Sequence, residues 1–380
     1  MITKDTIKNI GKKLCQAREL QSLSLDVVEQ ATGILTGRLS LIEKGETRPS
    51  GDELLILANY YCHDFRDFLA DDRPEPFKQS EILYRKHGDS FTPADRRAIK
   101  EFLYLCEIEA DLETEMGIRK KSFSHTPQGT FFKAHGEPAA HELRKLLGYK
   151  ENEIPRDIYT DFRNIGIHIF RRRLKNSDIS GLFIEHPIAK HCVLVNYDED
   201  IYRQRFSICH EVAHTIFDSS DAVVVSFRQY DGKDYSELRA NRFASCYLMP
   251  PNKLPQVSSW TTELAVKWAQ EFRVSTSALA VALQQAEMID ESTAKIIKSV
   301  RVPNNNKIDP EIPNSFTEKQ RERKLALLER GLSDYYVNLC FDAYQNGFIS
   351  AGRLSEAFLA TYSETKEISI LYGRSINYGS

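Results

Sequence analysis

The spacing of apolar residues along the chain predicts helices toward both ends and a mixed region in the middle. Between residues 8 and 70, apolar positions recur at helical intervals in four short segments that turn residues separate. A longer helix is predicted from Thr92-Pro93-Ala94-Asp95, which combines an N-cap residue, a proline in the first turn and an acid. Helical spacing returns over residues 261–300 and again from residue 317 onward.

The middle of the chain carries the β-type patterns. Residues 165–170 alternate in the manner of a strand, and turn residues bound the short apolar runs at 181–184 and 192–195. Two helices are predicted after them, near 203–218 and 235–249, and the prolines at 250 and 251 end the second. The predicted fold class is therefore mainly α with a small β-sheet, an α+β protein.

Composition shifts predict where these parts are joined. A Pro-rich stretch at 72–76 and an Asn- and Pro-rich stretch at 302–315 interrupt the helical patterns. The expected division lists five parts: a helical domain over 1–72, a helical connector over 73–138, a central domain with a helical closure over 139–300, a linker over 301–316 and a C-terminal helical region over 317–380.

Composition and charge narrow the function classes. With 41% hydrophobic and 28% charged residues, the chain is neither disordered, collagen-like nor membrane-embedded. Its net charge is −3, so binding to nucleic acid would need a local basic patch. The seven cysteines never form a C-x-x-C pair, which argues against a disulfide framework. No apolar block of signal-peptide or transmembrane length is present, so we expect a cytoplasmic protein without membrane contact.

The clearest chemical motif is His210-Glu211-Val212-Ala213-His214. On a helix, residues four positions apart share one face, so both imidazoles can bind one metal ion, and Glu211 beside them is placed to act as a base. Apolar residues around the motif, such as Phe206 and Cys209, predict a half-buried helix. The alternative is a helix with two structural histidines.

A catalytic zinc site uses three protein ligands and leaves a fourth position open, so a third ligand must come from elsewhere. Glu237 is the best candidate, because a helix over 235–249 places it on one face with Asn241, which can hydrogen-bond a ligating histidine. An ordinary solvated Glu237 is the alternative. Weaker candidates for the ligand lie in a segment of loop character: Asp218, Asp221, Asp231 and Asp234.

Residues 204–214, the Glu237-x-x-Ala-Asn-x-Phe-Ala pattern and Leu248-Met249-Pro250 together resemble the ImmA/IrrE family of metallopeptidases. The resemblance covers about residues 140–255. It implies a gluzincin-like zinc peptidase domain with a small antiparallel sheet beside two helices. It also implies that His210, His214 and Glu237 bind zinc (Zn²⁺) and that Glu211 is the catalytic base. The activity it implies is endoproteolysis of a helix-turn-helix repressor in a stress or mobile-element response.

Two features of this site stay open in the sequence. The sequence does not distinguish among four candidates for the residue that stabilises the transition state: Tyr230, Tyr235, His186 and His191. A substrate could add as a strand to an exposed sheet edge, around residues 181–184.

The N-terminal helices carry a second pattern. Ser24 begins one helix, Thr32-Gly33-Ile34 forms a turn, and residues 35–43 predict a helix that ends in Ile-Glu-Lys-Gly. This spacing resembles the Xre (lambda-repressor-like) helix-turn-helix family. In that geometry the third helix enters the major groove of DNA. The resemblance then implies these DNA-contacting residues: Thr36, Gly37, Arg38, Ser40, Leu41, Lys44 and Arg48.

Some positions depart from the family pattern. Leu35 occupies a place where a capping serine is common, and Gly37 weakens a helix by about 1 kcal/mol relative to alanine. Residues 1–50 hold eight Lys and Arg against six Asp and Glu, which is a modest basic excess. The alternative is a helical module for protein interaction or dimerisation that does not bind DNA.

The whole sequence therefore predicts a DNA-binding transcriptional regulator with zinc-dependent endopeptidase activity. The expected partners are DNA, a repressor-type protein substrate and a second copy of the chain in a homodimer. The intact Glu211 favours an enzyme, because a structural metal site does not need a base. The alternative is an Xre-type transcription factor or antitoxin whose zinc domain is a non-cleaving sensor. The C-terminal helices could supply core, a dimer surface or a sensor.

Overall fold

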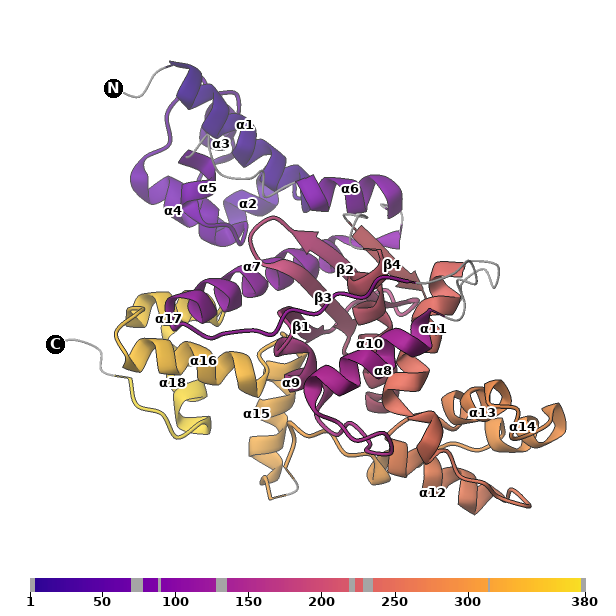
Figure 1. Cartoon of the computed structure of the whole chain (residues 1–380). Coiled ribbons are helices and arrows are strands. Elements are labelled where there is room, and N and C mark those ends of the chain that lie inside the picture. Colours follow the sequence, from indigo (N-terminus) through magenta and orange to yellow (C-terminus); the bar gives the residue numbers. More distant parts are fainter. Residues whose placement is uncertain are drawn as a thin grey trace.

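The computed structural model describes residues 4–69, 78–87, 90–127, 135–218, 223–227, 235–313 and 315–376, and the Pro-rich stretch at 72–76 lies outside these ranges. Helices surround one four-stranded sheet, with a separate group of helices at the N-terminal end (Figure 1). The predicted fold class, mainly α with a small sheet, is confirmed. Within the described ranges, no helix combines the length and the apolar character that crossing a membrane requires.

Five helices make up the N-terminal group: α1 (Lys4–Leu20), α2 (Leu25–Thr32), α3 (Thr36–Glu43), α4 (Gly51–Tyr60) and α5 (Phe65–Leu69). Ser24 caps α2 by accepting a hydrogen bond from the Val27 amide. Gly33 takes the left-handed conformation, with φ +74°, and turns the chain from α2 into α3. These helices enclose an apolar core of their own, which includes Leu14, Val28 and Leu39.

The sheet contains β1 (Ile167–Arg172), β2 (Ile179–His186), β3 (Lys190–Asn196) and β4 (Val223–Phe227) in the order β1-β3-β2-β4. Because β1 and β3 are parallel and the other pairs antiparallel, the sheet is mixed, whereas the family resemblance implied an antiparallel one.

Two details of the sheet differ from the sequence prediction. β4 falls in a segment that we predicted to be a loop, although its run Val223-Val224-Val225 is a β-type signal. Residues 181–184 are not at an edge, because β2 pairs with β3 on one side and with β4 on the other. Among the described strands the edges are β1 and β4.

One face of the sheet is covered by the helices that carry the sequence motif. The helices of this layer share a single apolar core: α8 (Gly136–Leu147), α9 (Ile158–Arg163), α10 (Ile201–Phe217), α11 (Tyr235–Leu248), α12 (Thr262–Phe272), α13 (Thr276–Gln285) and α14 (Glu291–Lys298). α10 packs on β2 and β3, and α11 packs between α10 and α8. Gly136 permits that packing, since a Cβ atom there would lie 2.5 Å from the Arg239 carbonyl oxygen.

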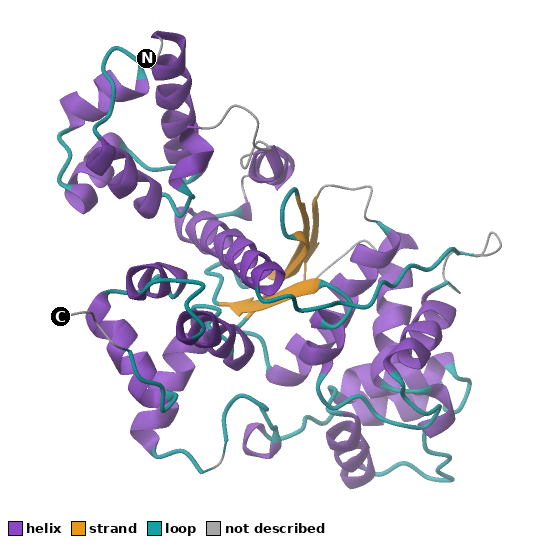
Figure 2. Cartoon of the chain, turned by 60° about the vertical axis from the view of Figure 1, so that its left-hand side comes forward, coloured by secondary structure: helices purple, strands orange, loops and turns teal. Residues whose placement is uncertain are grey.

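The other face of the sheet is covered by a second layer and a second apolar core. This layer consists of α6 (Lys78–His87), α7 (Pro93–Glu115), α15 (Glu318–Glu329), α16 (Asp334–Gln345), α17 (Ala351–Ala357) and α18 (Tyr362–Leu371). Phe102 of α7 and Tyr336 of α16 both pack edge-on against Phe170 of β1. The segment predicted as a connector and the C-terminal region thus share one core with the sheet. Figure 2 shows how helices surround the strands.

Candidate metal centre

Three buried side chains from α10 and α11 converge on one point. The Nε2 atoms of His210 and His214 are 3.1 Å apart, and oxygens of Glu237 lie 3.2 Å from the former and 3.4 Å from the latter. Ligands held at 2.0–2.1 Å around a tetrahedral ion are about 3.3 Å from each other. The three donors therefore have the spacing of ligands that share one small cation, and two nitrogens with one oxygen are a donor set that suits zinc.

The second nitrogen of each imidazole has its own partner. His210 Nδ1 lies 3.1 Å from Asn241 Oδ1, and His214 Nδ1 lies 2.8 Å from Asp218 Oδ2. Asp218 also accepts a hydrogen bond from Arg239. When both imidazoles donate through Nδ1, each keeps its Nε2 lone pair for an ion.

Asn241 takes the place that the sequence predicted for it. Asp218, a weaker candidate for the ligand in the sequence, instead contacts Nδ1 of His214. It is not among the three convergent donors. Its position four residues after His214 is the sequence signal that indicates this contact.

The electrostatics of the centre favour a positive charge there. Burial lowers the pKa of a histidine, but hydrogen bonds to Asp218 and Glu237 reverse this and raise the pKa of His214 to about 10. Burial raises the pKa of a carboxyl group, yet hydrogen bonds from His210 and His214 bring the pKa of Glu237 below its usual range. A divalent cation can take the place of the proton that this arrangement stabilises.

Glu211 lies beside this centre and is fully buried. Burial raises the pKa of its carboxyl group, and the charges of His210 and His214 partly offset that effect. Neither carboxylate oxygen forms a hydrogen bond of regular geometry in the described part of the chain, although the Ser226 hydroxyl lies close enough to lower the pKa of Glu211. β2 confines the group from one side, because a Cβ atom at Gly181 would lie 2.9 Å from Glu211 Oε1. Glu211 is thus a confined carboxylate next to the convergent donors, suited to accept a proton.

A cleft of about 1040 Å³ opens over the centre, and His210, Glu211 and Glu237 are among the residues that line it. Ser180 of β2 and Ser226 of β4 line its sheet side. The opposite wall includes the first turn of α13 and residues 301–304 and 307. The segment predicted as a linker therefore contributes a wall of this cleft.

The candidates for stabilising the transition state do not gather at the centre. His186 pairs with Glu107 of α7 on the other side of the sheet, and His191 pairs with Glu185. Neither histidine lines the cleft, and nor does the exposed Tyr235. Four residues named from the sequence lie outside the described residues: Tyr230, Asp221, Asp231 and Asp234.

The residues predicted to contact DNA lie in and just after α3, and several use their polar groups within the domain. Arg38 donates to both carboxylate oxygens of Glu53, at 2.8 and 2.9 Å, and to the Arg48 carbonyl oxygen. The Glu29 carboxylate accepts a hydrogen bond of 2.7 Å from the Thr36 amide and so supplies the helix cap that Leu35 lacks.

The outward face of α3 is largely apolar or neutral. Leu35 is 66% exposed and Leu41 39% exposed. Gly37, Lys44 and Arg48 are also exposed, while Thr36 and Ser40 are half-buried. Residues 4–69 contain nine Lys and Arg against ten Asp and Glu, so the small basic excess of the first 50 residues does not extend to the whole group of helices.

Comparison with known proteins supports the central part of this description. Residues 162–284 match the family model Peptidase_M78, the IrrE N-terminal-like domain. The matched range begins in α9, ends in α13 and includes the sheet and both helices of the metal centre. Searches of curated proteins and of solved structures return no match. The central part of the chain is therefore a domain of the metallopeptidase type, with a His-His-Glu group that can hold a metal ion.

Proposed function

We propose that the chain is a zinc-dependent endopeptidase with His210, His214 and Glu237 as metal ligands and Glu211 as the catalytic base. The observation that carries this proposal is the convergence of three donor atoms at ligand spacing beside the fully buried carboxylate of Glu211. A bound zinc ion supplies Lewis acidity, which polarises a peptide carbonyl and lowers the pKa of water.

In this proposal the residues of the chain transfer the proton, orient the metal ligands and bind the substrate backbone. Glu211 accepts a proton from the attacking water and passes it to the leaving nitrogen of the peptide bond. Asn241 and Asp218 fix the two imidazoles through their Nδ1 atoms. The substrate backbone adds along β4, which pairs with only one neighbour among the described strands and whose Ser226 lines the cleft.

Metal analysis of the purified full chain tests the centre directly. We expect one zinc ion per chain in the wild type and a loss of zinc in Glu237→Ala, because two imidazoles alone leave the coordination incomplete. Glu322→Ala, which removes an exposed glutamate of α15, is the matched control and keeps its zinc. A wild-type protein that holds no zinc when zinc is supplied would overturn the proposal.

For the N-terminal helices we propose a regulatory role in which α3 binds DNA and the peptidase cleaves a repressor-type protein. The arrangement α2-turn-α3 and the exposure of α3 support this role. The test is the salt dependence of DNA binding by the full chain. Each lost phosphate contact makes the plot of log binding constant against log salt concentration less steep. We expect Lys44→Glu with Arg48→Glu to weaken DNA binding, while Arg119→Glu, on an exposed loop, leaves it unchanged. Equal binding by all three proteins would argue for a protein-interaction module instead.

The alternative, a regulator or antitoxin with a non-cleaving zinc sensor, explains less of the geometry. A sensor has no use for the carboxylate of Glu211, whose full burial is costly to the folded state. A regulatory response that is identical in wild type and Glu211→Gln would favour this alternative.

A further inference from the structure

The cleft extends well beyond the metal centre, and its extension carries positive charge. Three basic side chains line it: Arg203, Arg301 and Lys307. Arg203 precedes His210 by seven residues on α10, which corresponds to about 10 Å along the helix axis. Arg301 and Lys307 belong to the opposite wall, in the segment after α14.

There are more basic side chains in this part of the cleft than acidic side chains that pair with them. Arg203 pairs at 2.9 Å with the buried Glu199, and Lys307 pairs with Asp200. Arg301 is exposed and forms no ion pair with any residue in the described ranges. Apart from Glu211 and Glu237 at the metal centre, Asp200 is the one acidic residue among those described that line the cleft.

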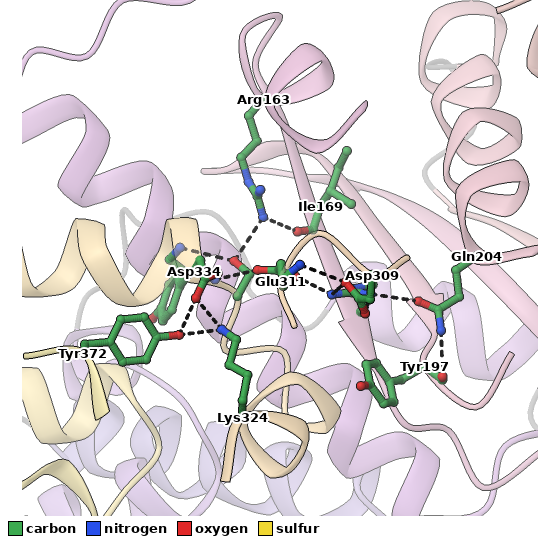
Figure 3. A network of polar contacts seen from close by, with 12 residues as sticks. Arg163, Ile169, Tyr197, Gln204, Asp309, Glu311, Lys324, Asp334 and Tyr372 are labelled. Atoms are coloured by element: carbon green, nitrogen blue, oxygen red, sulfur yellow. Dashed lines mark hydrogen bonds and ion pairs between the residues drawn. The ribbon is translucent and has the colours of Figure 1, made fainter. Parts of the chain in front are cut away.

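The wall that carries Arg301 is fixed to the rest of the protein. We call residues 301–313 the strap. Arg171 of β1 donates to Asp309, at 2.7 Å, and to Glu311, and the same guanidinium contacts Gln204 of α10. Figure 3 shows Asp309 and Glu311 at the centre of this network, between the sheet, α10 and the C-terminal helices.

Two further contacts fix the ends of the strap. Glu311 accepts a hydrogen bond of 2.6 Å from the Asp334 amide at the start of α16. At the other end, the Thr276 hydroxyl donates to the Val300 carbonyl oxygen, directly before Arg301. Arg301 is therefore held at the cleft by a backbone that is anchored on both sides.

We propose that this wall selects peptide segments that carry an aspartate or glutamate a few residues from the scissile bond, with Arg301 as the specificity determinant. An extended peptide rises about 3.3 Å per residue, so about three residues span the axial separation of His210 and Arg203 along the cleft. The inference rests on the proposed peptidase function, because it takes the cleft to be the substrate site.

Peptide binding to the full-length, zinc-loaded Glu211→Gln variant tests the proposal without turnover. The probes are fluorescent 12-residue peptide pools with glutamate fixed at one position and random residues elsewhere, each paired with a glutamine pool. We expect glutamate at one or two adjacent positions to strengthen binding about fivefold, the upper range for an exposed ion pair, and salt to reduce the difference. Adding Arg301→Gln removes the preference, whereas Arg119→Gln, at another exposed arginine that does not line the cleft, keeps it.

Equal binding of glutamate and glutamine pools at every position overturns the inference, and so does the absence of any peptide binding. An equal loss in the Arg119→Gln control also overturns it, because the effect would then be one of net charge. The proposed function fails separately. If wild type cleaves both pools equally, the proposed peptidase activity is retained and the proposed acidic specificity is rejected. If the variant prefers glutamate but wild type cleaves no peptide, the proposed acidic specificity is retained and the proposed peptidase activity is rejected.

Discussion

The metal centre and the α2–α3 face use their polar side chains in opposite ways. At the metal centre, each imidazole satisfies one nitrogen inside the protein and leaves the other toward a common point. On the N-terminal helices, Arg38 is bound to Glu53, and Arg18 is bound at 2.7 Å to Glu43. These ion pairs stabilise the helical group, but the first of them uses Arg38, the one cation within α3, which is then not free for a phosphate backbone.

The difference shows how a binding site can be distinguished from a folded surface. A site keeps bonding capacity unused in the isolated chain, and the surrounding structure stabilises that arrangement. The buried carboxylate of Glu211 meets this criterion. The side chain of Arg38 does not, although its position in a helix-turn-helix pattern made it a candidate DNA contact.

The largest effect that we expect comes from Glu211→Gln. Glutamine keeps the shape of the side chain but cannot accept a proton from water, so peptide cleavage should fall roughly 10²- to 10⁴-fold. Zinc content should stay at the wild-type level, because Glu211 is not one of the three convergent donors. Cleavage rates and elemental analysis on the same preparation check both parts, and an unchanged rate would falsify the role of Glu211.

Gly181→Ala should produce the next largest effect. The new methyl group would lie 2.9 Å from Glu211 Oε1 and 3.0 Å from the Leu194 carbonyl oxygen, so the carboxylate or the strand must move. A displacement of this size costs about 10- to 100-fold in turnover. Gly352→Ala is the control, since its nearest contact is 3.8 Å away. The prediction is wrong if both variants have the same kcat and KM as wild type.

Arg38→Ala should change stability and its dependence on pH. A hydrogen bond from Arg38 holds the pKa of Glu53 at about 2, against an ordinary value of 4.5. Because the folded-state pKa is the lower one, the ion pair stabilises the folded state above about pH 4.5, and this contribution is lost as the pH falls toward 2. The variant should lose about 0.2–1 kcal/mol at pH 7 and little at pH 2.

Hydrogen exchange of the α3 and α4 amides, measured at both pH values in wild type and variant, follows this difference. The same loss at pH 7 and pH 2 would show that packing, and not the ion pair, accounts for the effect of Arg38.

The smallest expected change is an increase in the stability of the folded state. Gly37 lies within α3, and a Cβ atom there would meet nothing within 4 Å, so Gly37→Ala should stabilise the helix by up to about 1 kcal/mol. Gly33→Ala has the same open space but requires a positive φ of 74°, and should destabilise by a similar amount. Thermal unfolding of the two variants separates helix propensity from backbone strain. A destabilised Gly37→Ala would mean that α3 is not the helix described above.

The parts of the molecule that could be predicted from the sequence depend on local spacing. His210 and His214 are four residues apart on one helix, so their common face follows from the helix repeat alone. The placement of Asn241 one turn after Glu237 follows for the same reason. Ser24 and Gly33, the residues that bound α2, are recognisable from capping preferences.

The features that were missed depend on contacts between distant segments. The pairing of Arg38 with Glu53 requires the loop between α3 and α4 to bring the two side chains together. The strap has the composition of a linker, and the groups that hold Asp309 and Glu311 in place, Arg171 of β1 and the Asp334 amide of α16, are far from it in the sequence. The loss of the edge at residues 181–184 required the short strand β4, which comes after α10.

The shared core on the far side of the sheet has a consequence for how the protein is made. α7 is synthesised before the sheet, but α16, which also covers Phe170, emerges from the ribosome more than 150 residues after that strand. Until then the sheet has an uncovered apolar surface, and the strap has no Asp334 amide to hold Glu311. A copy whose synthesis stops before α16 therefore lacks part of the support for its cleft, and its uncovered apolar surface favours aggregation.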